Sequence, residues 1–484
     1  MKLHYLTKKL SVLSSTADQE TEIAGIAYDS RAVQPGFAFV AIRGLETDGH
    51  RYISGAVNNG ASVIVCEEPP AEDVPYLLVE NSRLALSLMS AAWYGNPAEE
   101  MKLIGVTGTS GKTTGTHLIR HILQEAAGAK VGLIGTISNY IGPEEIHTEF
   151  TTPESLELQG LFRRMADAGC SYAVMEVSSH SLALDRVGGL RFDVAAYTNL
   201  SQDHLDFHKT MEEYASAKRK LFTMCSSACI NLDDAYASFM MDGAVCPCLT
   251  TSASDPAADL FADHIVLTPQ GVSFEAVYQG RRVPVRLAIP GLFSVHNALT
   301  ALSVCLSAGI SLEDAAVALK SAKGVKGRVE IVPTDSDYTI LIDYSHKPDA
   351  LENVLKTLRP ITRGRLVTLF GCGGDRDRRK RPIMGQVAAQ YSDFVIVTSD
   401  NPRTENPDAI IEEIMEGMKN SSTPIRREPD RVKAIHYAID MAASGDVLLL
   451  AGKGHEDYQI VGHEKHHMDE REIVADYLRE KSSL

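Results

Sequence analysis

A glycine-rich turn between an apolar strand and a helix constrains the fold of this chain more than any other segment. It lies in LIGVTGTSGKTTGTHLIRHIL, from Leu103 to Leu123. The apolar start predicts a buried strand, and residues 113–125 have the pattern of a helix. The backbone N–H groups of the turn then converge on the N-terminus of that helix, where the helix dipole adds partial positive charge. Such a segment favours α/β layers with an anion, typically a phosphate, bound at the turn.

The turn differs from the common phosphate-binding loop, which has a glycine five positions before its Gly-Lys pair. Val106 stands at that position, although Gly111, Lys112 and Thr113 are intact. The lysine can reach terminal phosphates, and the threonine hydroxyl suits Mg²⁺. The alternative is an ordinary glycine-rich turn with a surface lysine. The strand and helix on either side favour the nucleotide site.

The bulk properties restrict the classes of protein open to this chain. With 484 residues it is too long for a single core. The net charge of −16 argues against a nucleic-acid-binding surface, which needs clustered Lys and Arg. No apolar run is long enough to span a membrane, and the N-terminal segment lacks the apolar core of a signal peptide. We therefore expect a cytoplasmic protein without a nucleic-acid partner or membrane insertion, whose charge still allows a local cationic pocket for a small anionic substrate.

Four of the eight cysteines lie close together in the sequence, at Cys225, Cys229, Cys246 and Cys248. Their spacing fits no common zinc-binding pattern. We expect free thiols here rather than a metal site.

Short apolar strands alternate with amphipathic helices along most of the chain, which predicts an α/β fold with parallel sheets. Residues 94–102 and 321–330 have the composition of domain boundaries, and residues 260–290 alternate with period two, as in β-hairpins. The expected domains are an N-terminal α/β domain at 1–98, a central domain with the nucleotide loop at 99–328, and a C-terminal domain at 329–484.

Polar residues follow further predicted strands of the central region. Glu176 ends the strand in YAVMEVSSH, and His204 lies in TNLSQDHLDFH after the next strand. A glutamate and a histidine at neighbouring strand ends can form a second metal site, although a surface acid and a structural histidine are the alternative. Lys218 lies on the predicted helix EEYASAKRKLF, and the local sequence alone predicts a solvent-exposed side chain.

In the last third, charged residues of both signs follow three predicted strands, an arrangement that suits a zwitterionic ligand. The alternative is a set of solvated loops with local ion pairs. These residues are Arg376, Arg378, Arg379 and Arg381, then Asp400, Asn401 and Arg403, then Lys453, His455 and Glu456.

Taken together, these segments resemble the Mur ligase family over nearly the whole chain. The loop at 108–113 matches the shortened phosphate loop of the family. The other family motifs follow in order: TTPE, MEVSSH, TNLSQDHLDFH, YASAKRKLF, HNALTAL, GRVE, DYSHKPD, GCGGDRD, DNPR and GKGHEDYQ. The resemblance implies a uridine-nucleotide-binding N-terminal domain, a central P-loop ATPase domain with a parallel sheet, and a Rossmann-like C-terminal domain that brings the incoming amino acid. We expect a monomer.

The resemblance also implies a reaction of cytoplasmic peptidoglycan precursor synthesis. An amide forms between the D-Glu γ-carboxylate of UDP-MurNAc-L-Ala-D-Glu and an amino group of meso-diaminopimelate, and ATP becomes ADP and phosphate. The carboxylate is activated as an acyl phosphate, so two anions must meet in a site of concentrated positive charge. The alternatives are an L-lysine-adding Mur ligase, a folylpolyglutamate synthetase-like ligase, a D-Ala-D-Ala-adding ligase, or a non-catalytic nucleotide-binding module.

Site residues carried over from the family fall into groups. For ATP they are Gly108, Thr109, Ser110, Gly111, Lys112, Thr113, Thr114, Asn297, Arg328 and Asp343. For two Mg²⁺ sites they are Thr113, Glu176, His204 and Lys218, and the catalytic group is Lys112, Lys218, Glu176 and His204. Lys218 matches a family lysine that CO₂ carbamylates; carbamylation needs a buried lysine with a lowered pKa. For the uridine-linked dipeptide they are Ser30, Thr151, Thr152, Ser178 and Arg186.

The choice of amino acid depends on the DNPR motif, which accompanies diaminopimelate addition in this family, whereas lysine-adding members usually lack its arginine. A guanidinium matches the second carboxylate that lysine lacks. The implied diaminopimelate site is Arg376, Asp400, Asn401, Pro402, Arg403, Gly452 and Glu456.

Several positions depart from the family pattern. Ser110 stands where Asn is usual, and Ser345 where Ala is usual. We expect a solvated loop rather than a metal site at His463, His466 and His467.

Overall fold

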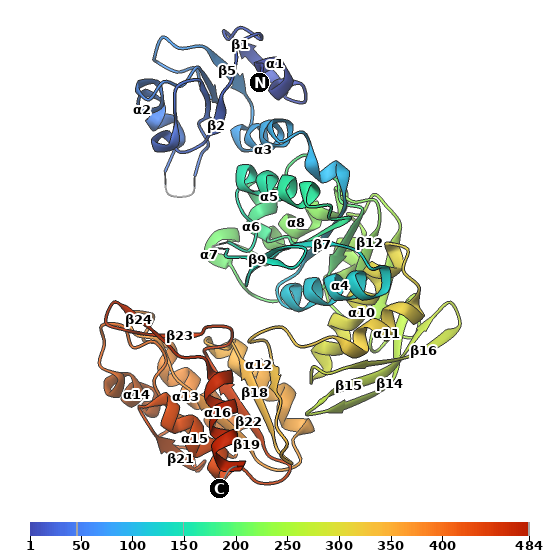
Figure 1. Ribbon diagram of the computed structural model, residues 1–484, viewed down its shortest axis with the longest axis vertical. Helices are drawn as coiled ribbons and strands as arrows, with labels where there is room; N and C mark the ends of the chain where they lie inside the picture. Colours follow the sequence, from blue (N-terminus) through green and yellow to red (C-terminus); the bar gives the residue numbers. More distant parts are fainter. Residues whose placement is uncertain (45–46, 149, 483–484) are drawn as a thin grey trace. The chain divides into compact units, whose positions relative to one another are not determined.

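The computed structural model (Figure 1) describes residues 1–44, 47–148 and 150–482. The chain divides into two compact units. The first unit comprises Met1–Leu260 and Thr300–Ala315, and the second comprises Phe261–Leu299 and Ala316–Leu484. Helices and largely parallel sheets make up both units, which confirms the predicted α/β class. The predicted limits of the three domains stay a prediction.

The chain begins with a five-stranded sheet in the order β1-β5-β4-β3-β2. Only the β1–β5 pair is antiparallel. The strands are β1 (Val12–Ser15), β2 (Gly25–Ala27), β3 (Phe37–Val40), β4 (Val63–Cys66) and β5 (Tyr76–Val79). The helices are α1 (Leu3–Thr7), α2 (Ile53–Asn58) and α3 (Ser82–Trp93), with 3-10 turns η1 (Ser30–Ala32), η2 (Gly49–Tyr52) and η3 (Pro97–Glu100). Leu3, Val40, Val63 and Leu86 belong to the core between the sheet and its helices.

The central sheet of the first unit has the order β13-β12-β11-β6-β10-β7-β8-β9. It is parallel from β13 to β7 and antiparallel at β7–β8 and β8–β9. The strands are β6 (Lys102–Thr107), β7 (Val131–Ile134), β8 (Asn139–Ile141), β9 (Glu144–Ile146), β10 (Tyr172–Glu176), β11 (Val194–Tyr197), β12 (Ala228–Asn231) and β13 (Cys248–Ser252).

Helices of the central region are α4 (Lys112–Ala127), α5 (Ser155–Asp167), α6 (Ser179–Ala183), α7 (Leu205–His208), α8 (Met211–Arg219) and α9 (Ala237–Met241), with η4 (Lys220–Thr223) after α8. The predicted strand at β6 and helix at α4 are therefore confirmed. Glu176 pairs with Val106 in the β10–β6 register, and Tyr197 pairs with Thr107 in the β11–β6 register. The carboxyl ends of these three strands thus share one edge of the sheet, beside the glycine-rich turn.

The second unit contains β15 (Gly271–Tyr278) and β16 (Arg281–Leu287), which pair antiparallel, and all of β14 (Leu260–Thr268) except its first residue. The period-two alternation predicted them. Helices α10 (Leu292–Ser307) and α11 (Leu312–Ser321) follow, and each is divided between the two units.

A six-stranded sheet completes the second unit, in the order β17-β18-β22-β19-β20-β21. It is parallel except at β17–β18. Its strands are β17 (Glu330–Val332), β18 (Thr339–Asp343), β19 (Leu366–Phe370), β20 (Phe394–Val397), β21 (Ile425–Arg427) and β22 (Val447–Ala451). The helices are α12 (Pro348–Leu358), α13 (Lys380–Tyr391), α14 (Pro407–Glu416), α15 (Arg431–Met441) and α16 (Glu470–Ser482), with η5 (Arg359–Ile361) and the hairpin β23 (Tyr458–Val461)–β24 (Glu464–His467).

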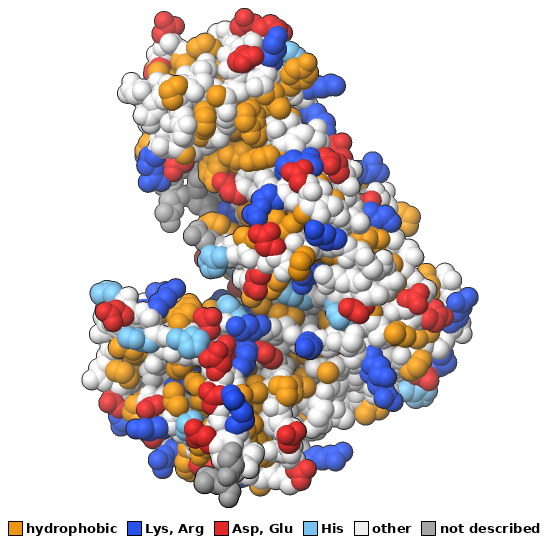
Figure 2. Space-filling model, in the orientation of Figure 1, with side chains coloured by type: hydrophobic (Ala, Val, Ile, Leu, Met, Phe, Trp, Pro, Cys, Tyr) orange, Lys and Arg blue, Asp and Glu red, His pale blue; other side chains and the backbone are white. Residues whose placement is uncertain are grey.

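Acidic and basic side chains alternate over the visible surface rather than gathering into one basic patch (Figure 2). Among the described residues, no helix combines the length and the apolar composition that crossing a bilayer requires.

Candidate active site

The glycine-rich turn has a backbone that only glycine can adopt at its first position. Gly108 has φ +151°, and an added Cβ would lie 1.8 Å from Thr198 Oγ1. Gly111, with φ +85°, is the N-cap residue of α4 and offers no side-chain cap. The first N–H groups of α4 therefore face the turn without a capping side chain of that residue, which is the arrangement that binds phosphate.

Asn199, from the segment after β11, holds the turn in place. The Ser110 N–H donates to Asn199 Oδ1 at 3.0 Å, and Asn199 Nδ2 donates to the Ser110 carbonyl at 3.2 Å. The Thr198 hydroxyl donates to the same carbonyl at 2.7 Å. The Ser110 side chain itself is exposed. The loop thus depends on the backbone of residue 110, so the departure from Asn leaves its shape intact.

Lys112 lies over the turn. Its ammonium donates to the Gly108 carbonyl at 2.9 Å and to the Thr109 carbonyl at 3.0 Å. Thr113 and Thr114 lie in the first turn of α4 and are buried. The predicted ATP-binding residues 108–114 therefore form the turn and the first turn of α4.

Glu176 is a buried acid with a full set of donors. It is 1% exposed at the end of β10. Its carboxylate accepts from the Thr113 hydroxyl at 3.1 Å, the Thr136 N–H at 2.9 Å and the Thr136 hydroxyl at 3.0 Å. Burying a carboxylate is costly without such partners. The interpretation as a surface acid is wrong, and two predicted Mg²⁺ ligands, Thr113 and Glu176, are in contact.

Lys218 is 1% exposed, so the exposed side chain that its local sequence predicts is wrong. The α8 face that carries it packs inward because Tyr214 and Ala215 share that side. Its Nζ donates to the Gly108 carbonyl at 2.8 Å and lies 4.5 Å from the centre of the Tyr214 ring. Burial, and then the nearby charge of Lys112, lower the pKa of Lys218 well below its ordinary value. The lysine thus lies directly against the phosphate loop as a readily neutralised amine.

His204 is the N-cap residue of α7, with φ +54°, and its side chain is exposed. It packs against the His180 ring at 4.8 Å and faces the Tyr214 ring at 6.2 Å. Tyr214 in turn bonds Thr109 Oγ1 at 3.1 Å. His204, Lys218 and the loop therefore surround the same tyrosine, which sequence reasoning did not single out.

The residues predicted to contact the uridine-linked dipeptide form two separate groups. Thr152 and Ser178 bond each other, and Arg186 donates to the Thr152 carbonyl at 3.1 Å and to Glu154 at 3.2 Å. Thr151 joins this group, because its hydroxyl lies 3.0 Å from the Thr136 hydroxyl beside Glu176.

Ser30 belongs to the second group. It lies in η1 of the N-terminal sheet region, on a cavity of about 450 Å³ whose lining includes Tyr28, Phe39, Gly49 and Tyr52. No described contact joins Ser30 to Thr152 or Arg186.

In the second unit, Asp343 ends β18 and is buried. It accepts from the Val329 N–H at 2.8 Å and from the Ser345 N–H at 2.9 Å, and burial raises its pKa. The Arg328 guanidinium lies 5.5 Å from the centre of the Tyr344 ring. Asn297 is buried in α10. Arg328 and Asp343 are thus neighbours through Val329 and Tyr344, while no described contact joins Asn297 to them.

A buried polar network links the ends of β20 and β22. Lys453 is fully buried, and its ammonium donates to Asn401 Oδ1 at 2.8 Å and to Glu456 Oε2 at 3.0 Å. Asn401 Nδ2 donates to the same Glu456 oxygen at 2.9 Å. Asp400 Oδ1 is buried without a hydrogen bond, 3.5 Å from Lys453. Gly452, with φ +109°, lies beside Asp400. The network contains three predicted residues and Lys453, which was outside the predicted site.

Two arginines flank Gly373 in the turn after β19. A Cβ at Gly373 would meet Arg403 Nη1 at 2.9 Å and Arg376 Cγ at 3.9 Å. Arg403 has φ +50° and donates to the Gly374 carbonyl at 2.8 Å, while Pro402 before it is buried. The Arg376 side chain is exposed. Arg376 and Arg403 thus flank the turn at Gly373, where an added Cβ would also lie 3.8 Å from the Asn401 carbonyl oxygen.

Other charged residues of this region form ion pairs instead. Arg381 is buried between Glu405 and Glu413, at 2.8 Å from each, Arg378 also pairs with Glu413, and Arg379 pairs with Asp377. For these three arginines, the alternative of local ion pairs is correct. His463, His466 and His467 lie in an exposed hairpin, where His467 Nε2 is 2.6 Å from Glu472.

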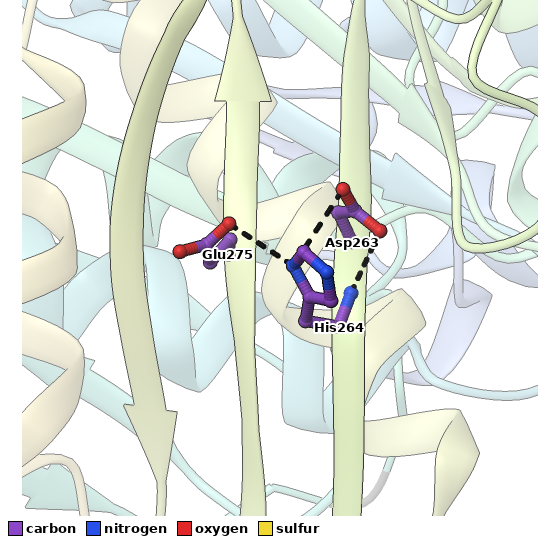
Figure 3. A group of neighbouring side chains, drawn as sticks. All are labelled: Asp263, His264 and Glu275. Carbon is purple, nitrogen blue, oxygen red and sulfur yellow. Dashed lines mark hydrogen bonds and ion pairs between the residues drawn. The ribbon is translucent and has the colours of Figure 1, made fainter.

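Within the described ranges, one group of three His, Cys, Asp or Glu side chains has ligand atoms close enough together for a metal ion. It consists of Asp263, His264 and Glu275 (Figure 3). Arg282 already donates to Asp263 at 2.8 Å and to Glu275 at 2.7 Å. The group is therefore a partly exposed ion-pair cluster on the β14–β15 strands.

Thr136, Asn199 and Tyr214 contact the predicted site residues but were not predicted from the sequence, and Lys453 was named among the charged residues at strand ends but was not assigned to the diaminopimelate site. Asn199 and Lys453 stand in motifs that were singled out, so their position after a strand was an available signal. Thr136 had none, because its two contacts with Glu176 arise only from the packing of β7 against β10.

Three family models match the chain. They are described as Mur ligase family, catalytic domain, at residues 22–94; Mur ligase middle domain, at residues 106–305; and Mur ligase, glutamate ligase domain, at residues 327–454.

Among curated proteins, the chain is 46% identical over 488 residues to the UDP-N-acetylmuramoyl-L-alanyl-D-glutamate–2,6-diaminopimelate ligase of Clostridium botulinum, covering 99% of this chain and 100% of that protein. It is 48% identical over 462 residues to the ligase of the same name from Caldanaerobacter subterraneus subsp. tengcongensis, covering 95% of both chains.

Solved structures show the same fold. A structure of a UDP-N-acetylmuramoyl-L-alanyl-D-glutamate–2,6-diaminopimelate ligase matches with a TM-score of 0.78 and 31% identity, covering 100% of this chain and 99% of that one. The MurF ligase of Thermotoga maritima, solved in complex with ADP, matches at 20% identity with a TM-score of 0.59, covering 96% of this chain and 98% of that one, and indicates the fold alone.

Proposed function

Since the chain belongs to the Mur ligase family, we propose that it joins meso-diaminopimelate to the D-Glu γ-carboxylate of UDP-MurNAc-L-Ala-D-Glu, with conversion of ATP to ADP and phosphate. The observation that carries the proposal is 46% identity, over essentially the full length of both chains, to a ligase named for these substrates. The substrates belong to cytoplasmic peptidoglycan precursor synthesis, so the enzyme acts in the cytoplasm as a soluble catalyst.

The turn at residues 108–113 holds the ATP phosphates. Its cradle is closed to any side chain at Gly108, and Lys112 and the N-terminus of α4 offer positive charge and N–H donors. By the family pattern, Asn297 would contact the adenine, Arg328 a phosphate and Asp343 the ribose.

Mg²⁺ fits the donor set here, because Thr113 and Glu176 bring hard oxygen ligands together and His204 and Lys218 lie nearby around Tyr214. When bound, Mg²⁺ neutralises phosphate charge and polarises the transferred phosphoryl group. Thr113 would help hold a first Mg²⁺ on the phosphates, and Glu176, His204 and the carbamylated form of Lys218 would hold a second.

Carbamylation of Lys218 is supported by its burial and lowered pKa, which leave a neutral amine able to attack CO₂. The attack forms a C–N bond and releases one proton, so the neutral amine becomes an anionic carbamate whose oxygens can bind a metal ion.

Two anions must approach each other in the first chemical step, in which the substrate γ-carboxylate attacks the γ-phosphorus of ATP and ADP leaves. Lys112 lies at the turn where positive charge is needed. The amine of diaminopimelate then attacks the acyl phosphate, and inorganic phosphate leaves. Thr151, Thr152, Ser178 and Arg186 hold the dipeptide beside Glu176, through Thr136.

Diaminopimelate carries two ammonium and two carboxylate groups. Arg376 and Arg403 match carboxylates, and the Glu456 and Asp400 oxygens match an ammonium. The remaining positions of this site are Asn401, Pro402 and Gly452. L-Lysine lacks the second carboxylate, so Arg403 provides selectivity against it.

The test measures phosphate release with UDP-MurNAc-L-Ala-D-Glu and ATP, comparing meso-diaminopimelate with L-lysine. We expect rapid release with diaminopimelate and little with lysine. Equal turnover on both amino acids would contradict the selectivity, and release with lysine alone would favour the lysine-adding alternative. Absence of release with either would leave a nucleotide-binding module.

A further inference from the structure

Two cysteine sulfurs of the first unit are in contact. Cys225 Sγ lies 3.4 Å from Cys246 Sγ, and all eight cysteines are free thiols. Cys225 is 7% exposed, whereas Cys246 is partly exposed. Neither residue belongs to the site described above.

The backbone holds the two cysteines side by side. The Ser226 N–H donates to the Phe192 carbonyl at 2.9 Å and the Phe192 N–H donates to the Met224 carbonyl at 2.8 Å, which positions the segment around Cys225. The Ala228 N–H donates to the Pro247 carbonyl at 2.9 Å, next to Cys246. The sulfur contact therefore joins two segments that main-chain hydrogen bonds already position.

The neighbouring cysteines do not turn this pair into a metal site. Cys229 Sγ faces Ser307 Oγ at 3.5 Å, and Cys248 Sγ faces the Cys246 carbonyl at 3.7 Å. Within residues 1–44, 47–148 and 150–482, no three cysteine sulfurs come close enough together to hold one ion. The arrangement is a dithiol pair.

We propose that Cys225 and Cys246 are a reversible disulfide site, oxidised by a low-molecular-weight disulfide. The Cys246 thiolate attacks the reagent disulfide, forms a mixed disulfide and releases one reagent thiolate. The Cys225 thiolate then attacks the Cys246 sulfur and releases the second. The two protein thiols thus lose two hydrogens and two electrons, and one reagent disulfide becomes two thiols.

Exposure sets the order of the two steps. Cys246 is the partner that a reagent in solution can reach. Burial raises the pKa of Cys225, which makes that thiol a poor first nucleophile. Once the mixed disulfide exists, Cys225 is already in contact with the sulfur it must attack. Bond formation shortens the separation to about 2.05 Å, a change that side-chain rotation can provide.

The disulfide would link the segment that follows the C-terminal end of α8, the helix that carries Lys218, to the segment that follows α9. The Arg219 guanidinium of α8 lies 4.7 Å from the centre of the Phe239 ring and donates to the Asp242 carbonyl at 3.4 Å. Cys225 follows η4, directly after α8, and Cys246 follows the α9 segment. A disulfide closes residues 226–245 into a loop and restricts the unfolded chain, so the oxidised unit resists unfolding.

The experiment incubates the native full-length protein with glutathione disulfide, blocks remaining thiols with N-ethylmaleimide, and maps peptides by mass spectrometry. We expect one cross-linked peptide pair joining Cys225 to Cys246, about 2 Da lighter than the two reduced peptides, and a higher melting temperature that dithiothreitol reverses. Cys248→Ser is the matched control and should form the same bond.

The single variants separate the two roles. Cys225→Ser should stop at a mixed glutathione disulfide on Cys246, because the resolving thiol is missing. Cys246→Ser should leave Cys225 unmodified, because it is buried. Diamide, a smaller oxidant, is applied in parallel in case glutathione cannot enter. A bond from Cys246 to Cys248, or no bond at Cys225 with either oxidant, would overturn the proposal.

Discussion

Lys218 shows how strongly burial can change the chemistry of one side chain. Its amine contacts the Gly108 carbonyl and an aromatic face, with Lys112 nearby. Its lowered pKa means that, between the folded value and the ordinary value near 10.5, the unfolded chain binds more protons than the folded one. The contribution of Lys218 to the free energy of unfolding therefore rises with pH across that window. At neutral pH the uncarbamylated lysine lowers the free energy of unfolding.

Replacing Lys218 by Met should raise the melting temperature at pH 7 and abolish phosphate release, because an apolar side chain fits the buried position but cannot be carbamylated. Differential scanning fluorimetry and a phosphate assay measure the two effects. Lys220→Met, in the neighbouring η4 turn, is the control and should keep its activity. A K218M protein that is less stable at pH 7 would contradict the sign of the pKa argument.

Removal of CO₂ gives a second test at the same residue. In degassed, bicarbonate-free buffer the wild-type rate should fall, and added bicarbonate should restore it, because the carbamate forms reversibly from a neutral amine. The rate is followed by phosphate release at constant pH. Bicarbonate-independent activity would show that an unmodified lysine suffices.

Arg403 should determine affinity for diaminopimelate. Arg403→Ala removes a charge-assisted contact, so we expect KM for diaminopimelate to rise about 10–100-fold while KM for ATP stays unchanged. Steady-state kinetics with each substrate varied in turn measures this. Arg379→Ala, whose side chain pairs with Asp377 on the surface, should change neither constant. An equal rise in both constants would place Arg403 elsewhere in the reaction.

Among the elements, the strand–turn–helix from β6 to α4 was the most predictable part of the molecule. Apolar residues, glycines and helix formers follow one another there, so local sequence and tertiary fold agree. The positions of Glu176 at a strand end and of the period-two hairpins also followed from pattern. The burial of Lys218 and Lys453, and the contacts of Thr136, could not be predicted locally, because each depends on partners from distant segments.

The turn offers a prediction with a close control. Gly108→Ala should abolish ATP binding, because the new Cβ collides with the Thr198 hydroxyl and the backbone there is unfavourable for alanine. Gly115→Ala, inside α4, has only Val106 Cγ1 at 3.9 Å as a neighbour and should stabilise the helix by up to about 1 kcal/mol. Nucleotide titration and thermal unfolding of both variants measure this. Normal ATP affinity in G108A would exclude the turn as the cradle.

The whole molecule carries a net charge of −16, and both nucleotide substrates are anions as well. Long-range repulsion therefore opposes their approach, even though the local site is cationic. Raising the salt from low ionic strength should increase kcat/KM for UDP-MurNAc-L-Ala-D-Glu by screening that repulsion. Diaminopimelate, with balanced charges, is the internal control and should respond little. A steep fall with salt would mean that attraction by the local cationic residues dominates.

The Thr136 hydroxyl has one hydrogen and contacts two oxygens. Glu176, as a carboxylate, can only accept, so the hydrogen of Thr136 points to it. Thr151 must then give its own hydrogen to Thr136. The two hydrogen bonds therefore run in one direction, from Thr151 through Thr136 to Glu176. The Thr151 hydroxyl can then only accept a hydrogen bond from a bound ligand. A ligand group that meets Thr151 must bring an N–H or O–H of its own, which favours an amide or a hydroxyl over a carboxylate at that position.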